Sequence, residues 1–200
     1  MAQKLNKIEK LISGLSPNSV EFFGLGDVCN IETGRLNANA AIDNGEYMFF
    51  TTAKEVSRIN SYRWDTEALL IAGNANVGDV KHYSGKFDAY QRTYVLTDFR
   101  KDVDIRFLYF VLSESLKKYL ETKKNKAAMT YIVLGTLQEF KIPVPPLEIQ
   151  KEIVKILDNF TELEAELEAE LEAELEARKK QYEYYRNLLL TFPEKKEKVS

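Results

Sequence analysis

The sequence predicts an α+β protein in which a mixed, strand-rich domain is followed by one long helix. Two observations support this prediction. Short β-type runs broken by Gly and Asn fill residues 20–146, and the 47 residues from Pro146 to Phe192 then contain no Gly and no further Pro. We therefore expect a short helix in residues 1–17, a globular domain in 18–145, a long helix in 146–192 and a disordered tail in 193–200.

The composition narrows the class of protein. With 44% apolar and 12% aromatic residues among 200, the chain can build a core, which excludes disorder as its main state. Cys29 and His82 are the only residues of their types, so neither an internal disulfide nor a Cys/His metal cluster can form. We expect a reducing, cytoplasmic setting. Charges throughout the first ten residues and the lack of a long apolar run argue against secretion and membrane insertion.

In residues 1–145, each element is predicted from a local pattern. Helical spacing of Leu5, Ile8, Leu11 and Ile12 predicts a short amphipathic helix that ends at Gly14. Strands are predicted over residues 31–34, 46–52, 68–72, 80–83 and 90–97. Residues 105–120 predict one substantial helix packed against these strands, with Asp102 and Asp104 as candidate caps.

The long helix begins after Pro145 and Pro146 and contains an internal repeat. The unit Leu-Glu-Ala-Glu occurs three times from Leu163, and a fourth unit reads Leu175-Glu-Ala-Arg178. Each unit adds about 6 Å of helix and turns its leucine by about 40° beyond a full turn. A helix this long must bury its apolar stripe against another helix. The alternative is a solvated Glu/Ala/Leu helix with no further role.

Charge is unevenly distributed along the chain. The net charge is −3, from 28 basic and 31 acidic residues, but eight of the glutamates lie in residues 161–177. The remainder has 28 basic against 23 acidic groups, a charge of +5 that is compatible with a polyanionic partner without establishing one. Lys117, Lys118, Lys123, Lys124 and Lys126 form a basic cluster, which suits either phosphate contact or an ordinary solvated helix end.

No catalytic constellation is found. The stretch Gly73-Asn-Ala-Asn-Val-Gly78 lacks the Gly-Lys-Ser/Thr ending of a phosphate loop, so a tight turn is the preferred interpretation. In the functional alternative, Asn74 and Asn76 project toward a base edge. Pro143-Val-Pro-Pro146 differs from the Asn/Asp-Pro-Pro-aromatic motif of amino-methylating enzymes at both chemically necessary positions. Neither these motifs nor the separated Cys29 and His82 support a hydrolase or transferase.

Two stretches resemble the specificity subunits of type I restriction-modification systems. They are Ala72-Gly-Asn-Ala-Asn-Val-Gly-Asp-Val-Lys-His-Tyr-Ser-Gly-Lys-Phe-Asp-Ala-Tyr-Gln-Arg-Thr-Tyr94 and Lys141-Ile-Pro-Val-Pro-Pro-Leu-Glu-Ile-Gln-Lys-Glu-Ile-Val-Lys-Ile-Leu-Asp158. The four-residue repeat is similar to the spacer repeat of type IC members. Family members usually contain two target-recognition domains and two conserved helices, so this chain resembles half of such a subunit.

The resemblance implies a target-recognition domain that reads double-stranded DNA and has no catalytic activity. A second copy would pair through antiparallel long helices, which implies a split palindromic target. The helices would also bind modification (methyltransferase) subunits, and a restriction subunit would join through the complex. S-adenosylmethionine, ATP and magnesium would be used by those partners, so no cofactor or metal is expected on this chain.

Two sets of residues are predicted to make these contacts. The DNA-facing candidates are Arg35, Asn37, Lys54, Arg58, Arg63, Asn74, Asn76, Lys81, His82, Lys86, Arg92, Lys123, Lys124 and Lys126. The helix candidates, expected to bury against a second copy or a modification subunit, are Ile149, Ile153, Leu157, Phe160, Leu163, Leu167, Leu171, Leu175, Tyr182 and Leu189. The rival hypothesis is a coiled-coil adaptor whose globular head binds protein and has no DNA specificity.

Overall fold

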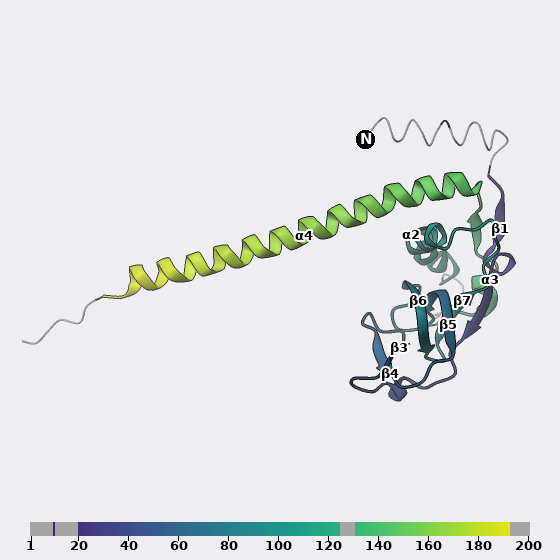
Figure 1. Cartoon of the computed structure of the whole chain (residues 1–200), viewed down its shortest axis with the longest axis horizontal. Helices are drawn as coiled ribbons and strands as arrows, with labels where there is room; N and C mark the ends of the chain where they lie inside the picture. The colour runs from purple at the N-terminus through teal and green to yellow at the C-terminus, as the bar shows by residue number, and fades with distance from the viewer. Residues whose placement is uncertain (1–9, 11–19, 125–130, 193–200) are drawn as a thin grey trace, which may run out of the picture. The chain divides into compact units, whose positions relative to one another are not determined.

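The computed structural model describes residues 10, 20–124 and 131–192 of the chain, and it confirms the predicted α+β class (Figure 1). The chain forms two compact units, Met1–Val154 and Lys155–Ser200. The boundary between them falls inside the long helix α4 (Leu147–Leu190), whereas the sequence suggested a boundary at Pro146. The helix begins inside the first unit because Ile149 and Gln150 are buried there.

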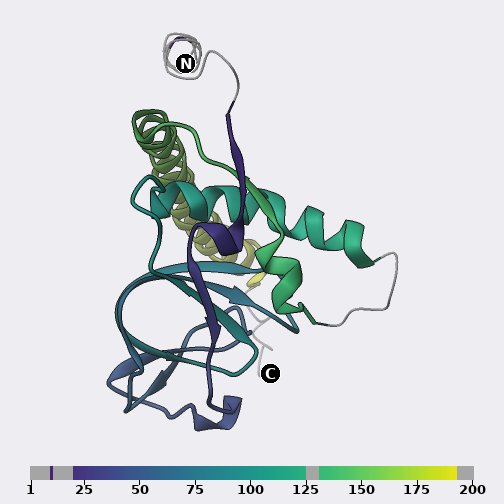
Figure 2. The same ribbon diagram turned by 90° about the vertical axis from the view of Figure 1, so that its right-hand side faces the viewer.

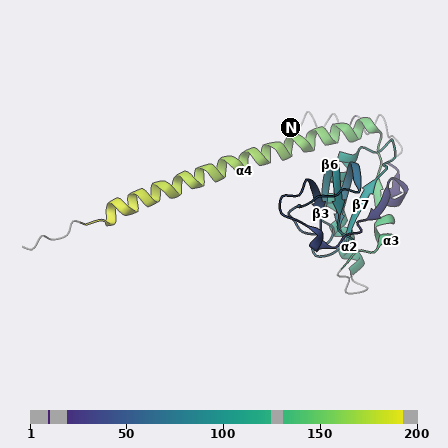
Figure 3. The ribbon, with the colours of Figure 1, turned by 60° about the horizontal axis from the view of Figure 1, so that its bottom comes forward.

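Six strands of the first unit form one sheet in the order β2, β7, β5, β6, β3, β4. Their bounds are Asn30–Thr33 (β2), Tyr47–Phe50 (β3), Ser57–Ile59 (β4), Trp64–Ala72 (β5), Val80–Ala89 (β6) and Thr93–Thr97 (β7). Neighbouring strands are antiparallel except β3 and β6, which are parallel. The sheet curls (Figures 2 and 3). Although β5 and β6 lie between β7 and β3 in the sheet, the hydroxyl of Thr93 in β7 donates to the carbonyl of Phe50 in β3 at 3.2 Å.

Strand β5 contributes side chains to two apolar cores of the first unit. Its residues alternate in direction, as strand residues do. Leu69 and Ile71 belong to one core, shared with the helix α2, and Ala68 and Leu70 belong to the other, shared with Phe87. Because both faces of β5 are covered over residues 68–72, this part of the strand is a continuous apolar run rather than an alternating one.

Helix α2 (Ile105–Lys124) lies across the sheet (Figure 2). Its buried leucines Leu108, Leu112 and Leu116 are four residues apart and therefore share one face of the helix. Of the two predicted caps, Asp104 is the one that acts, since its Oδ1 accepts a hydrogen bond from the backbone N of Phe107 at 2.9 Å. The predicted helix is thus confirmed, with four more residues at its end.

A second, two-stranded sheet leads into α4. Strands β1 (Phe22–Gly24) and β8 (Lys141–Pro143) pair antiparallel, which joins segments far apart in the sequence. Gln150, three residues into α4 and fully buried, then holds the helix start. Its Nε2 donates to the carbonyls of Asp102 at 2.7 Å and Pro145 at 2.6 Å, and its Oε1 accepts from the backbone N of Asp104 at 2.8 Å.

Several short elements were not predicted from the sequence. They are β1, β4, β8, the 3-10 turns η1 (Leu25–Asp27) and η2 (Ala38–Ala40), and the helix α3 (Leu134–Gln138). Each has three to five residues, which is too short for an apolar period to be recognised. Residues 90–92, predicted as part of a strand, form a turn before β7. The predicted N-terminal helix, apart from Lys10, and the predicted tail lie outside the described residues.

Candidate nucleic-acid interface

Five loop segments meet at one end of the curled sheet. We call residues 34–37, 51–54, 73–79, 90–92 and 131–132 the loop cluster. Backbone hydrogen bonds of 2.8–2.9 Å join four of them, running from Gln91 N to Leu36 O, from Gly73 N to Arg92 O and from Ile132 N to Gly73 O. A further one, from Tyr90 N to Phe50 O, ends at the last residue of β3, directly before the segment 51–54. These bonds place residues from five separated parts of the sequence on one surface.

The surface of the loop cluster is mainly basic. Arg35, Lys54 and Arg92 are exposed there, and the first two form no ion pair among the residues that the structure describes. The acidic Asp79 is matched by two lysines, Lys81 at 3.3 Å and Lys117 at 3.4 Å. Charge left unpaired in the cluster is therefore positive, as phosphate contact requires.

Three asparagines of the loop cluster differ in how they are held. Asn37 Oδ1 accepts from Gln91 Nε2 at 3.1 Å, and Asn76 Nδ2 donates to the carbonyl of Thr52 at 2.8 Å, so both connect loops. Asn74 Oδ1 is buried and has no hydrogen-bond partner in the part of the chain described here. Next to it, Ala75 has φ of 53°, a left-handed conformation that is unfavourable for a residue with a side chain.

Lys81 also has intramolecular hydrogen-bond partners. Its Nζ donates to the carbonyl of Ala53 at 2.9 Å in addition to its ion pair with Asp79. The structure therefore brings together seven of the predicted DNA-facing residues in the loop cluster or at its edge, namely Arg35, Asn37, Lys54, Asn74, Asn76, Lys81 and Arg92. Of these, Asn37, Asn76 and Lys81 already have intramolecular partners.

A second basic group lies along β4, β6 and the start of β5. Arg58 Nη1 donates to the carbonyl of Glu46 at 3.4 Å, and Lys86 Nζ lies 4.7 Å from the ring centre of Tyr62. Arg63 is the most strongly held of the predicted residues. It pairs with Glu32 at 3.1 Å, donates to the carbonyl of Thr33 at 3.2 Å and lies over the ring of Trp64 at 4.4 Å.

The remaining candidates lie elsewhere. His82 is on the face of β6 that meets α2, with Nε2 2.8 Å from Glu67 Oε1 and its ring 6.1 Å from that of Tyr109. Lys123 is exposed at the end of α2, 5.3 Å from the ring of Tyr119. Lys126 and the side chain of Lys124 lie outside the described residues.

Sequence reasoning missed the aromatic component of both surfaces. Tyr131 in the loop cluster and Tyr62 in the second basic group are 50% and 46% exposed. Each lies under a predicted basic residue, Arg92 at 5.8 Å and Lys86 at 4.7 Å. The pairs Arg92–Tyr131 and Lys86–Tyr62 are separated by 39 and 24 residues, so no local motif could reveal them.

The described residues offer little for catalysis. Burial raises the pKa of the Cys29 thiol to about 12, and its Sγ lies 3.3 Å from the carbonyl of Leu25. Within the described ranges no three His, Cys, Asp or Glu residues gather as metal ligands. None of the helices described is long and apolar enough to cross a membrane.

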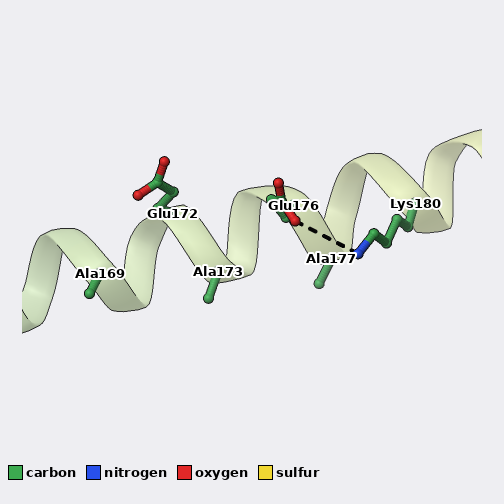
Figure 4. A pocket seen from close by; sticks show the side chains of 6 residues that line it. All are labelled: Ala169, Glu172, Ala173, Glu176, Ala177 and Lys180. Carbon is green, nitrogen blue, oxygen red and sulfur yellow. Dashed lines mark ion pairs between the residues drawn. The ribbon is translucent and has the colours of Figure 1, made fainter. Parts of the chain in front are cut away.

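In the second unit, α4 presents its predicted apolar residues to solvent. Leu163, Leu167, Leu171 and Leu175 are 55–58% exposed, and Tyr182 and Leu189 are exposed further along. Ala169, Ala173 and Ala177 form another row, beside an ion pair of Glu176 with Lys180 at 3.7 Å (Figure 4). Leucines and alanines are two residues apart in each repeat, so their rows lie on nearly opposite sides.

One helix candidate must be corrected. Ile149 is 1% exposed and belongs to the core of the first unit, so its side chain is not available to a partner. Ile153 and Leu157 are half-buried, and Phe160 is 44% exposed. The surface that a second helix could cover therefore develops beyond Ile149 and is most exposed from Phe160 onward.

Comparisons with known proteins agree on one family. The sequence model of the type I restriction modification DNA specificity domain matches residues 17–177. The chain is 40% identical over 134 residues to the type I restriction enzyme EcoDI specificity subunit of Escherichia coli, covering 67% of this chain and 29% of that protein. It is 33% identical over 186 residues to the MpnII specificity subunit of Mycoplasma pneumoniae, covering 90% and 56%.

Solved structures show the same fold. The chain is similar to a type I restriction-modification S subunit from M. genitalium, with a TM-score of 0.67, 15% identity and coverage of 90% of this chain and 51% of that one. The HsdS subunit from Thermoanaerobacter tengcongensis gives a TM-score of 0.56 at 21% identity, covering 83% and 45%. The chain thus spans about half the length of these structures, and 29% and 56% of the two curated relatives.

Proposed function

Because the chain belongs to the type I restriction modification DNA specificity family, we propose that it is a sequence-specific DNA-recognition subunit without catalytic activity of its own. The observation that carries the proposal is the loop cluster. It presents Arg35 and Arg92 on loops that are joined by short backbone hydrogen bonds, and Lys54 on a loop whose Thr52 carbonyl accepts from Asn76 Nδ2. A rigid basic surface of this kind can bind phosphates in one register and so position base contacts.

The proposed roles of the candidates follow from how they are held. Arg35, Lys54 and Arg92 contact phosphates, because they are exposed. Asn74 is the candidate for base reading, since an asparagine amide matches the donor and acceptor of adenine. Its Oδ1 is buried in the free chain, so this role requires the side chain to turn outward when DNA binds. Asn37, Asn76, Lys81 and Arg63 shape the surface instead. The second basic group with Arg58 and Lys86 extends the contact along the backbone.

We further propose that the chain acts as a half-subunit. Two copies pair their α4 helices antiparallel, which relates the two recognition domains by a two-fold axis and makes the DNA target a split palindrome. Support comes from the exposed apolar row Leu163 to Leu175 of α4. The same helices would scaffold modification and restriction subunits, which would use S-adenosylmethionine, ATP and magnesium.

The test is selection from a random duplex DNA pool. The purified chain is used with and without a modification subunit, and the retained DNA is sequenced. We expect a split inverted repeat. Enrichment of no sequence in either form would overturn the proposal in favour of a protein-binding adaptor.

A charge-matched pair of variants locates the interface. Arg35→Ala, Lys54→Ala and Arg92→Ala together should weaken binding and flatten the dependence of affinity on salt, because each lost phosphate contact releases about one counterion fewer. The control removes the same charge from exposed lysines outside the loop cluster, Lys101, Lys141 and Lys151. Equal slopes for the two triple variants would exclude the loop cluster as the DNA-binding surface.

A further inference from the structure

The segment Tyr131–Val133 is unusually well held for a surface loop that exposes apolar side chains. Ile132 is 5% exposed and both of its backbone polar groups are used. Its N donates to Gly73 O at 2.8 Å, and its O accepts from the hydroxyl of Tyr94 at 2.8 Å. Because the segment is extended, the residues on either side of Ile132 point outward, leaving Tyr131 50% and Val133 47% exposed.

Tyr131 has a basic surrounding. Arg92 lies 5.8 Å from the ring centre of Tyr131, and Tyr131 forms an isolated bridge with Asn74. Arg35 and Lys54 are exposed on neighbouring loops of the same cluster. An apolar side chain placed among unpaired cations suits a polyanion that also offers apolar groups, and the 5-methyl group of thymine is the apolar group in the major groove of DNA.

We propose that Tyr131 and Val133 are specificity-determining residues that contact thymine methyl groups within the DNA half-site. The inference rests on the proposed function. It adds recognition of an apolar group on a base, which basic and amide side chains do not provide. The anchored backbone of Ile132 matters because a contact worth only one methyl group is lost if its side chain can move away. Arg92, held over the ring, binds the adjacent phosphate and orients Tyr131.

The experiment measures affinity for one duplex in two forms. The duplex is the sequence recovered in the selection, and its second form carries uracil in place of every half-site thymine, which removes only the methyl groups. The wild-type chain is used with or without the modification subunit, whichever retained DNA in the selection. It should bind the uracil duplex about fourfold more weakly for each methyl group that it covers. Tyr131→Ala combined with Val133→Ala should weaken binding to the thymine duplex equally and show no further loss with uracil.

Controls separate this contact from folding and from charge. Phe22→Ala removes another exposed aromatic, 61% exposed in β1 and outside the loop cluster, and should leave both affinities unchanged. The double variant should keep the wild-type thermal midpoint and the wild-type salt slope, because an apolar contact releases no counterions.

Distinct outcomes overturn the inference. A half-site without thymine, equal affinity of the wild type for both duplexes, or a double variant that still discriminates thymine from uracil would each do so. Unchanged DNA binding with loss of the modification subunit would assign the patch to a protein partner instead. If the wild type retains no DNA at all, the proposed function fails, and this result is distinguishable from all of the others.

Discussion

Deleting one repeat from α4 tests the idea that the helix sets the gap between half-sites. The helix has 44 residues, Leu147–Leu190, and is about 66 Å long at 1.5 Å per residue. Removing Leu167 to Glu170 leaves about 60 Å. If two copies pair along their helices, their recognition domains move about 6 Å closer, which is about two base pairs of DNA at 3.4 Å each.

The direction of the apolar row after the deletion decides whether pairing survives. Four residues turn the helix by about 400°, so the residues beyond the deletion rotate by only about 40°. Tyr182 and Leu189 then remain near the same side as the leucines that are left. Removing two residues, Leu167 and Glu168, shortens the helix by only about 3 Å but rotates everything beyond it by about 200°. This smaller deletion is therefore the control.

The assay is selection and sequencing of bound duplexes for the wild type and both deletions, with helix content measured by circular dichroism. We expect the four-residue deletion to shorten the preferred spacer by about two base pairs with the same half-sites. The two-residue deletion should lose the paired target. An unchanged spacer, or altered half-sites, after the four-residue deletion would refute the reasoning that α4 acts as a spacer.

Three further predictions concern the first unit. Gln150→Leu removes the fully buried side chain that bonds to the N–H of Asp104 and to two carbonyls, and should lower the free energy of unfolding in urea by about 3 kcal/mol. Because the pKa of Cys29 is raised to about 12, native protein at pH 8 should resist alkylation while urea-unfolded protein reacts, as mass spectrometry will show. Burial raises the pKa of Asp88, so its folded form favours the proton and its contribution to stability falls as pH rises through that pKa. Asp88→Asn should therefore gain stability relative to wild type on going from acid to neutral pH in parallel urea titrations, and a constant difference would contradict the assignment.

Much of the fold could be predicted from local patterns. The apolar run 68–72, the spacing of the leucines of α2 and the long stretch without Gly or Pro after Pro146 can each be recognised from neighbouring residues alone. The basic character of the loop cluster could also be predicted in part, because Arg35, Lys54 and Arg92 are exposed loop residues of a type that contacts phosphate. Arg63 shows where such a prediction stops. Its guanidinium interacts with Glu32, Thr33 and Trp64, and those interactions compete with contact to a phosphate.

Ile149 and Ile153 show the same limit on α4. Both fit the helical apolar stripe, yet Ile149 is buried in its own unit while Ile153 is only half-buried. Periodicity identifies the side of a helix that is apolar and says nothing about what covers it. Gln150, a polar residue within an apolar stripe, could not be recognised as an anchor without its three backbone partners.

The sequence by itself determined the two longer helices α2 and α4, the main strands, the repeat length of α4 and its leucine row, since these depend on residues within a few positions of one another. Only the tertiary structure decided which loops share a surface. The parallel pairing of β3 with β6 and the hydrogen bond from Thr93 to Phe50 join residues about 40 positions apart. Backbone bonds from Gln91 to Leu36, from Gly73 to Arg92 and from Ile132 to Gly73 bring the segments of Arg35, Asn74, Arg92 and Tyr131 together. The physical reason is that strand register and sheet curvature arise from packing between distant segments, for which a single sequence carries no local signal.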